Sequence, residues 1–112
     1  LALRDCSITG TFKLPSRPLL SIRNIDVSNN AITGQIPSNN ISSIFPNLYY
    51  LDMSENDIHG LIPHEFGQMS LLGTLDLSNN HLFGGIPKNI SGARLLSSLR
   101  LSNNKLDGTV FP

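Results

Sequence analysis

Apolar and polar positions alternate in short runs that recur along the whole chain. The runs read I-D-V-S-N-N-A-I-T-G, L-D-M-S-E-N-D-I-H-G, L-D-L-S-N-N-H-L-F-G and L-R-L-S-N-N-K-L-D-G, and a variant, L-A-L-R-D-C-S-I-T-G, begins the chain. Each run follows the frame apolar-x-apolar-x-x-Asn-x-apolar-x-Gly, whose first residues alternate as in a half-buried strand. The Asn slot recurs at intervals of 24, 26, 24 and 24 residues and is filled by Cys6, Asn30, Asn56, Asn80 and Asn104.

A fixed period in the twenties with this frame indicates a leucine-rich repeat solenoid. We expect an α/β-type solenoid of right-handed coils, with a parallel β-sheet on the concave face and short 3₁₀ or helical turns on the convex side. The expected strands are residues 1–3, 25–27, 51–53, 75–77 and 99–101. Each buried Asn amide is expected to pair its own turn with the next coil. Cys6 forms only weak hydrogen bonds, so that rung of the Asn ladder is expected to be weaker.

The second half of each coil carries a different pattern. Gly-x-Ile-Pro follows the frame in three coils, which predicts an extended segment and then a bend. Apolar residues spaced by threes then predict a short 3₁₀ turn, as at Phe66 and Met69. The first coil has Lys13 in place of Pro, which predicts an irregular convex segment. The second coil has two extra residues between Pro37 and Leu51, which we place on the convex side.

The length and charge of the chain limit the classes of function that it can have. The 112 residues make about four and a half coils of one segment, 1–112, with 14% charged residues and a net charge of zero. Nothing therefore indicates binding to nucleic acid or to an anionic membrane surface. Neither end carries the polar cap that terminal repeats need. We expect an internal segment of a longer array, uncapped at both ends and joined to a membrane only through segments absent from this chain.

Catalytic chemistry is not indicated. His59, His64 and His81 occupy three different positions of the repeat, and none shares the strand face with the recurring Ser residues. No nucleophile–base pair is therefore suggested. Metal ligation needs clustered His, Cys or carboxylate groups, and the only cluster is the Asp column, whose members are spaced by one coil each. We expect a non-catalytic protein with no cofactor and no metal.

The recurring L-D-L-S-N-N followed by G-x-I-P resembles the plant-specific class of extracellular leucine-rich repeat proteins, over nearly the whole chain. The stretch S-I-F-P-N-L-Y-Y-L-D-M-S-E-N is most similar to receptor-like proteins. The resemblance implies a ligand-recognition segment of a plant cell-surface receptor in defence or developmental signalling. It also implies a protein or peptide ligand, a co-receptor, and a location at the cell surface or in the cell wall.

Two other functions fit the same family. The first is a secreted inhibitor of microbial cell-wall-degrading enzymes, similar to polygalacturonase inhibitors. The second is an ice-binding protein, which favours flat, regular Thr or Asn arrays. A mixed column argues against ice binding: it consists of Thr9, Thr33, His59, Phe83 and Asp107.

The resemblance implies that ligands meet the concave face. The candidate contacts are Arg4, Asn24, Asp26, Tyr50, Asp52, Glu55, Asp76 and Arg100. The Asp residues and the Ser residues two positions later recur so regularly that we expect generic hydrogen bonds between coils. The irregular members carry more information about specificity: Arg4, Tyr50, Glu55 and Arg100.

Two sequons lie in the convex segments. They are Asn40-Ile41-Ser42 and Asn89-Ile90-Ser91, each with Asn directly before an apolar residue expected to be buried. Asn40 and Asn89 are therefore expected N-glycosylation sites, which fits a secreted protein.

Overall fold

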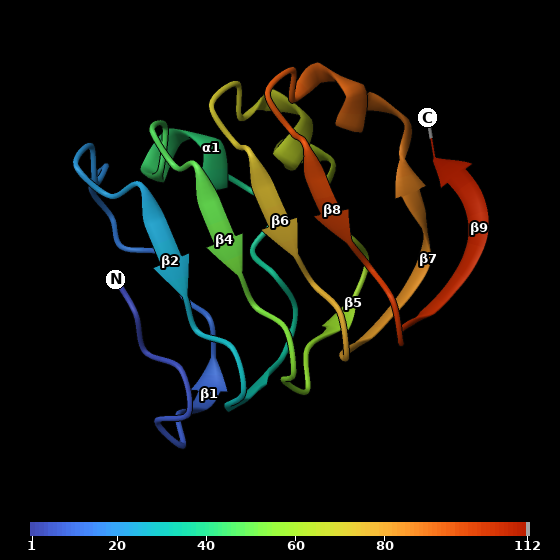
Figure 1. Ribbon diagram of the computed structural model, residues 1–112, viewed down its shortest axis with the longest axis horizontal. Coiled ribbons are helices and arrows are strands. Elements are labelled where there is room, and N and C mark those ends of the chain that lie inside the picture. Colours follow the sequence, from blue (N-terminus) through green and yellow to red (C-terminus); the bar gives the residue numbers. More distant parts are fainter. Residues whose placement is uncertain (112) are drawn as a thin grey trace.

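Parallel strands contributed by successive coils form the framework of the molecule (Figure 1). The structure is a computed structural model that describes the backbone of residues 1–111 and the side chains of residues 1–107. One sheet contains, in order, β2 (Asn24–Asp26), β4 (Tyr50–Asp52), β6 (Thr74–Asp76) and β8 (Ser98–Arg100). All its pairings are parallel and keep one register, so the expected concave sheet is confirmed. Pro112, the end of the predicted segment, lies outside the described residues.

The strands begin and end one residue earlier than predicted. The strand predicted at 25–27 spans Asn24–Asp26, and the other three of this sheet shift in the same way. The cause is the turn that follows, because the carboxylate of Asp26 accepts the Ser28 N–H and bends the chain directly after the strand. The strand predicted at 1–3 is reduced to a single bridge between Ala2 and Asp26.

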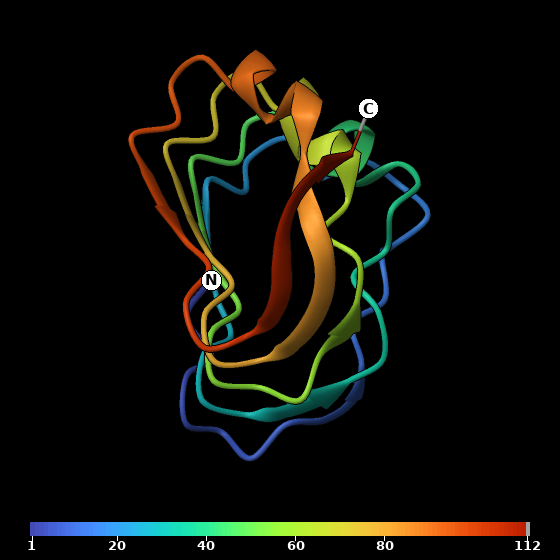
Figure 2. The ribbon, with the colours of Figure 1, turned by 90° about the vertical axis from the view of Figure 1, so that its right-hand side faces the viewer.

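The predicted extended segments also pair with one another, which the repeat pattern did not indicate. They form β1 (Thr9–Thr11) with β3 (Ala31–Thr33), and β5 (His59–Gly60) with β7 (His81–Pro87) and β9 (Lys105–Phe111). Figure 2 shows the coils in cross-section, with the main sheet on one side, these segments on the other and the helical turns between them at the top. Between β3 and β5, which are not paired as strands, the N–H groups of Asp57 and His59 donate to the carbonyl oxygens of Ile32 and Gly34, so neighbouring coils are joined on two sides.

The convex turns agree with the sequence. Two coils contain the expected 3₁₀ helices, η1 (His64–Gln68) and η2 (Lys88–Gly92). The first coil has no helix in its convex segment, as expected from Lys13. The second coil has an α-helical turn, α1 (Ile41–Ile44), in its convex segment, and β2 still pairs with β4 in register, so the extra residues lie between these two strands. The placement of the two extra residues on the convex side is confirmed.

The core is a column of inward-facing side chains that is closed in the middle and open at its ends. In the first inward column, Ile25 is 2% exposed, Leu51 1% and Leu75 0%, whereas Leu1 is 62% and Leu99 36% exposed. Full burial of one such side chain contributes about 1.5–3 kcal/mol. The inner coils therefore supply most of the apolar stabilisation.

The Asn ladder points to the preceding coil and not, as predicted, to the next. Asn56 donates through Nδ2 to the carbonyl oxygen of Val27 at 3.1 Å and accepts the Ile32 N–H at 3.0 Å. Alternate N–H groups of the extended segment point to opposite neighbours. Because the Ala31 N–H donates to Ile8 in the preceding coil, the Ile32 N–H faces the following coil, where Asn56 accepts it. Asn30, Asn80 and Asn104 repeat this arrangement.

Cys6 forms the weakest rung of the ladder. Its thiol makes one hydrogen bond, to the carbonyl oxygen of Arg4 at 3.2 Å, and its N–H donates to Asn30 Oδ1. The Cys6 side chain is exposed, whereas Asn56 and Asn80 are buried.

Candidate functional site

The outward face of the main sheet brings most of the candidate ligand contacts together. Side chains alternate between the two faces of a strand, so Asn24 and Asp26 face outward while Ile25 is buried. In register across the sheet, Asn24 lies opposite Tyr50, and Asp26, Asp52, Asp76 and Arg100 lie opposite one another. These six candidates form the concave face. Arg4 joins its edge, with Nε 3.7 Å from Asp26 Oδ2.

The Asp and Ser residues of this face bond within a coil and not between coils, which corrects the expectation. Asp76 Oδ1 accepts the N–H of Ser78 at 3.0 Å and its hydroxyl at 2.6 Å. The same pair of bonds occurs in the two preceding coils. The Ser side chains lie inside this turn and are buried; they are Ser28, Ser54 and Ser78. The role of these residues is therefore to shape the turn, and the Ser column is not a contact surface.

The second carboxylate oxygens of Asp26 and Asp52 contact Arg4 and Tyr50 on the outward face of the sheet. The Tyr50 hydroxyl donates to Asp52 Oδ2 at 3.4 Å. Burial, followed by the charges of Asp52, Asp26 and Asp76, raises the pKa of Tyr50 above its ordinary value. Like charges directly opposite one another in a sheet are unfavourable. The acidic column is therefore tolerated at a cost, with Arg4 beside one end and Arg100 in register at the other.

Glu55 differs from its counterparts in conformation as well as in charge. It lies in the turn after β4 with φ 56, in the left-handed region, and its equivalents share this conformation: Asp5, Asn29, Asn79 and Asn103. Asn and Asp tolerate this region better than other side chains. The Asn29 amide donates to Asp5, and the Asn103 amide donates to Asn79. Glu55 thus occupies a position that elsewhere suits a short amide or carboxylate, and its side chain is exposed at the rim of the concave face.

Glu65 joins two coils on the convex side, a contact that the sequence pattern did not predict. Its carboxylate accepts the N–H of Asn40 at 2.9 Å, the N–H of Ser42 at 3.0 Å and the hydroxyl of Ser42 at 2.9 Å. Burial alone would raise the pKa of Glu65, but the hydrogen bonds from Ser42 and Asn40, with the charge of His64, lower it below its ordinary value. The carboxylate therefore caps α1 from the next coil. A Glu after Pro-His gave no signal of this role in the sequence.

His59 and His81 lie in register on β5 and β7, and His64 begins η1 on the convex side. His81 Nε2 lies 3.5 Å from Asp57 Oδ1, and both side chains are exposed outside the concave face. Among the side chains that the structure describes, no three His, Cys, Asp or Glu residues lie together as metal ligands would. Within the described residues, no helix is long and apolar enough to cross a membrane.

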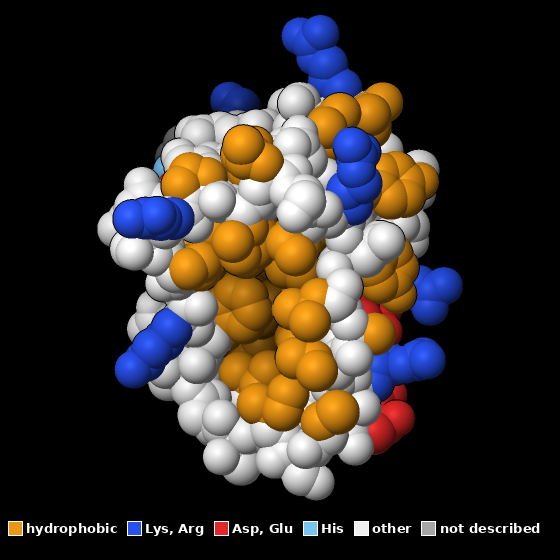
Figure 3. Space-filling model, turned by 90° about the vertical axis from the view of Figure 1, so that its left-hand side faces the viewer, with side chains coloured by type: hydrophobic (Ala, Val, Ile, Leu, Met, Phe, Trp, Pro, Cys, Tyr) orange, Lys and Arg blue, Asp and Glu red, His pale blue; other side chains and the backbone are white. Residues whose placement is uncertain are grey.

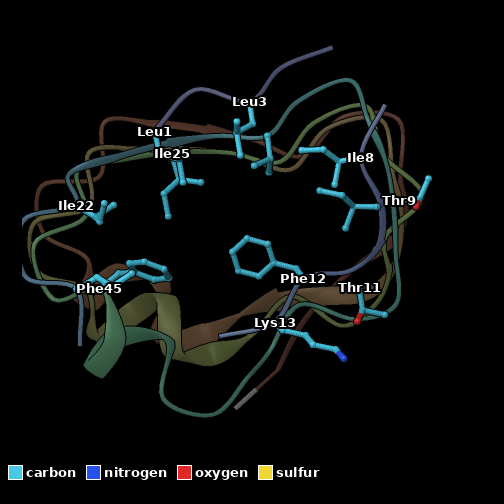
Figure 4. A pocket seen from close by; sticks show the side chains of 13 residues that line it. Leu1, Leu3, Ile8, Thr9, Thr11, Phe12, Lys13, Ile22, Ile25 and Phe45 are labelled. Atoms are coloured by element: carbon cyan, nitrogen blue, oxygen red, sulfur yellow. The ribbon is translucent and has the colours of Figure 1, made fainter. Parts of the chain in front are cut away.

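An apolar hollow opens at the end of the stack where the chain begins (Figure 3). It encloses about 270 Å³. Figure 4 shows Leu1, Leu3 and Ile8 lining one wall, with Phe12 and Phe45 across from them. Equivalent positions one coil later are covered, because Val27 is 5% and Ile32 4% exposed. The hollow therefore has the shape of a coil-stacking face.

Comparison with known proteins agrees with the repeat geometry. The family model described as Leucine rich repeat matches residues 20–82 and 46–106. The chain belongs to the leucine-rich repeat family. Its coils resemble a chain of the BIR3–SERK2 complex from Arabidopsis thaliana at 36% identity and TM-score 0.88, covering 98% of this chain and 58% of that one.

Two further relatives are plant receptors. The ectodomain of the Arabidopsis receptor kinase HAESA, solved with an IDA peptide hormone ligand, is 34% identical with TM-score 0.79, covering 89% of this leucine-rich repeat chain and 16% of that chain. Cuscuta receptor 1 from Solanum lycopersicum is 46% identical over 50 residues, which are 45% of this chain and 4% of that protein. The predicted likeness to plant receptor ectodomains is confirmed. The chain spans only part of each of these relatives.

Proposed function

We propose that this chain is a ligand-recognition segment of a plant cell-surface receptor and that it binds a protein or peptide through its concave face. The observation that carries the proposal is that the residues that repeat from coil to coil are buried in turns, whereas the residues that differ between coils are accessible. Ser28, Ser54 and Ser78 repeat and are buried in turns. Tyr50, Glu55 and Arg100 change from coil to coil and lie on the open face or at its rim. Variable side chains on a rigid framework are how repeat proteins obtain specificity.

The relatives support two kinds of partner for this chain, a peptide ligand and a second protein. HAESA was solved with a peptide hormone, and BIR3 was solved in complex with SERK2. We therefore assign this chain an extracellular location, a peptide or protein ligand, and a co-receptor as a second partner. The signalling pathway served is defence or development. Binding requires no catalysis, no cofactor and no nucleic acid.

We further propose that the hollow at the beginning of the stack receives another coil of the same array. The argument is continuity with the interface between coils: Leu1 and Leu3 occupy the positions that Ile25 and Val27 fill beneath a neighbour. A copy of residues 75–98 placed before Leu1 continues the repeat frame, because Leu99 follows Ser98 in the chain itself. This added coil should slow amide exchange at residues 1–8, and unchanged exchange there would refute this placement.

Binding is tested by selecting peptides from a random display library on the full natural ectodomain. The affinity of the best selected peptide is then compared between the wild type and Tyr50→Ala. We expect a loss of at least about tenfold, since a buried aromatic anchor contributes more than 1 kcal/mol. Gln68→Ala, on the exposed side of η1, is the control and should bind as the wild type does. Equal binding by the wild type, Tyr50→Ala and Arg100→Ala would exclude the concave face.

A further inference from the structure

A groove separates the first two coils on the convex side. The first coil has no helical turn in its convex segment, so α1 packs against η1 on one side and has no matching helix on the other. The open groove has a volume of about 490 Å³. The Leu19 N–H donates to the Ile44 carbonyl oxygen at 2.7 Å and joins the two walls.

The walls of the groove combine apolar side chains with a few polar groups. One wall comes from the irregular first coil and the other from the residues around α1; the lining is Leu14, Pro15, Ser16, Pro18, Pro37, Asn39, Asn40, Ser43 and Ile44. Apolar surface with sparse hydroxyl and amide groups suits a sugar, whose ring has a C–H face and an edge of hydroxyl groups.

Asn40 is the sequon residue, and it lines this groove. It stands directly before α1, where an Asn normally accepts a backbone N–H through its side chain. Here its φ is 72 and its side chain makes no capping hydrogen bond. The carboxylate of Glu65 takes that role by accepting the N–H groups of Asn40 and Ser42. The Asn40 backbone is thus held in place while its amide is left for another use.

We propose that Asn40 carries an N-linked glycan whose first N-acetylglucosamine lies in this groove and joins coil 1 to coil 2. Nδ2 of Asn40 forms a bond to the anomeric carbon of an oligosaccharide carried on a lipid pyrophosphate. The C–O bond to the pyrophosphate breaks, the lipid pyrophosphate leaves with the electron pair, and the amide nitrogen loses one proton to the transferase. The groove accommodates the sugar after the chain has folded. This inference rests on the extracellular location proposed above.

Asn89, in the second sequon, is the internal comparison. It lies on η2 and is exposed, and its Cγ lies 3.1 Å from where a Cβ on Gly67 would stand. It does not line the groove between coils 1 and 2. A glycan on Asn89 is therefore expected to leave that groove unaffected. Ser42→Ala is unsuitable as a test, because the Ser42 hydroxyl also donates to Glu65.

The test uses the full chain, secreted from plant cells behind an added signal and trimmed with an endoglycosidase to one sugar per site. Glycopeptide mass should show a sugar on Asn40. Amide exchange at residues 16–20, which include the Leu19 N–H, should be at least about threefold slower in the wild type and Asn89→Gln than in Asn40→Gln. Made in bacteria without glycans, wild type and Asn40→Gln should exchange alike at these residues.

Two results would overturn the inference. The first is an unmodified Asn40 in protein whose Asn89 carries a sugar. The second is a glycosylated Asn40 with exchange at residues 16–20 equal to that of Asn40→Gln. Because the secretion signal is added, neither result depends on whether the concave face binds a peptide, so the proposed function stands or falls separately.

Discussion

Replacing Asn80 by Ala tests the ladder at its most buried rung. Asn80 is 5% exposed, donates to the carbonyl oxygens of Met53, Leu77 and Ser78, and accepts the Ile58 N–H at 3.1 Å. Each carbonyl keeps another partner in the variant: Asn56 for Met53, Asn104 for Leu77 and the Glu55 N–H for Ser78. The Ile58 N–H, which lies in the core, loses its acceptor, Asn80 Oδ1. An orphaned buried donor costs about 1–3 kcal/mol.

Thermal unfolding measures the effect against a matched neighbour. At about 4 °C per kcal/mol for a domain of this size, Asn80→Ala should lower Tm by about 4–12 °C. Ser78→Ala removes a hydroxyl that donates to Asp76, but Asp76 keeps the Ser78 N–H and is partly open to water. Its cost should stay below about 1 kcal/mol. If both variants melt at the same temperature, the ladder does not hold the coils together.

Three other predictions concern single positions. Gly67→Ala should destabilise the fold by about 1–3 kcal/mol, because the added methyl would stand 2.1 Å from the Asn89 carbonyl oxygen; the exposed Gln68→Ala is its control in the same melting experiment. Glu65→Gln should lower Tm at neutral pH, and the difference should shrink on acidification below the ordinary value of 4.5. Because folding lowers the pKa of Glu65, its ionised carboxylate stabilises the fold at pH values above the pKa of the unfolded chain, and this stabilisation is lost as the pH falls through the folded pKa. A difference in Tm that does not change with pH would contradict this reasoning. Glu55→Asn should stabilise the fold by about 1 kcal/mol, since φ at this position is 56, and a lower Tm would show that the left-handed turn is not strained.

The repeat frame was sufficient to predict the coils because its period reports burial directly. Leu75 and Leu77 alternate with polar residues, and both are fully buried in the structure. The frame also located the irregular first coil and the extra residues of the second. It did not locate strand ends, because these depend on Asp26 accepting the Ser28 N–H, a local bond that the apolar pattern does not encode.

Contacts between coils were harder to predict than the coils themselves. The direction of the Asn ladder depends on which way alternate N–H groups point, and the pattern gives their spacing only. The cap on α1 comes from Glu65, which is 23 residues from Ser42 in sequence. The close packing of η1 on η2 requires Gly67 and Gly92, each of which contacts backbone of the other coil. Six candidate residues lie on the outward face of the sheet as expected, because strand alternation alone decides which face a side chain occupies. Arg4 and Glu55 lie outside the strands, so alternation does not place them.

The most direct test of ligand recognition is amide exchange of the full natural ectodomain with and without the best peptide selected from the random library. The account predicts slower exchange in β4 and β6 and in the turn that contains Glu55, with no change in η1 or η2. The peptide lies across the open face in that case, over Tyr50 and Asp76. Protection confined to the convex 3₁₀ helices, with exchange in β4 and β6 unchanged, would contradict recognition by the concave face.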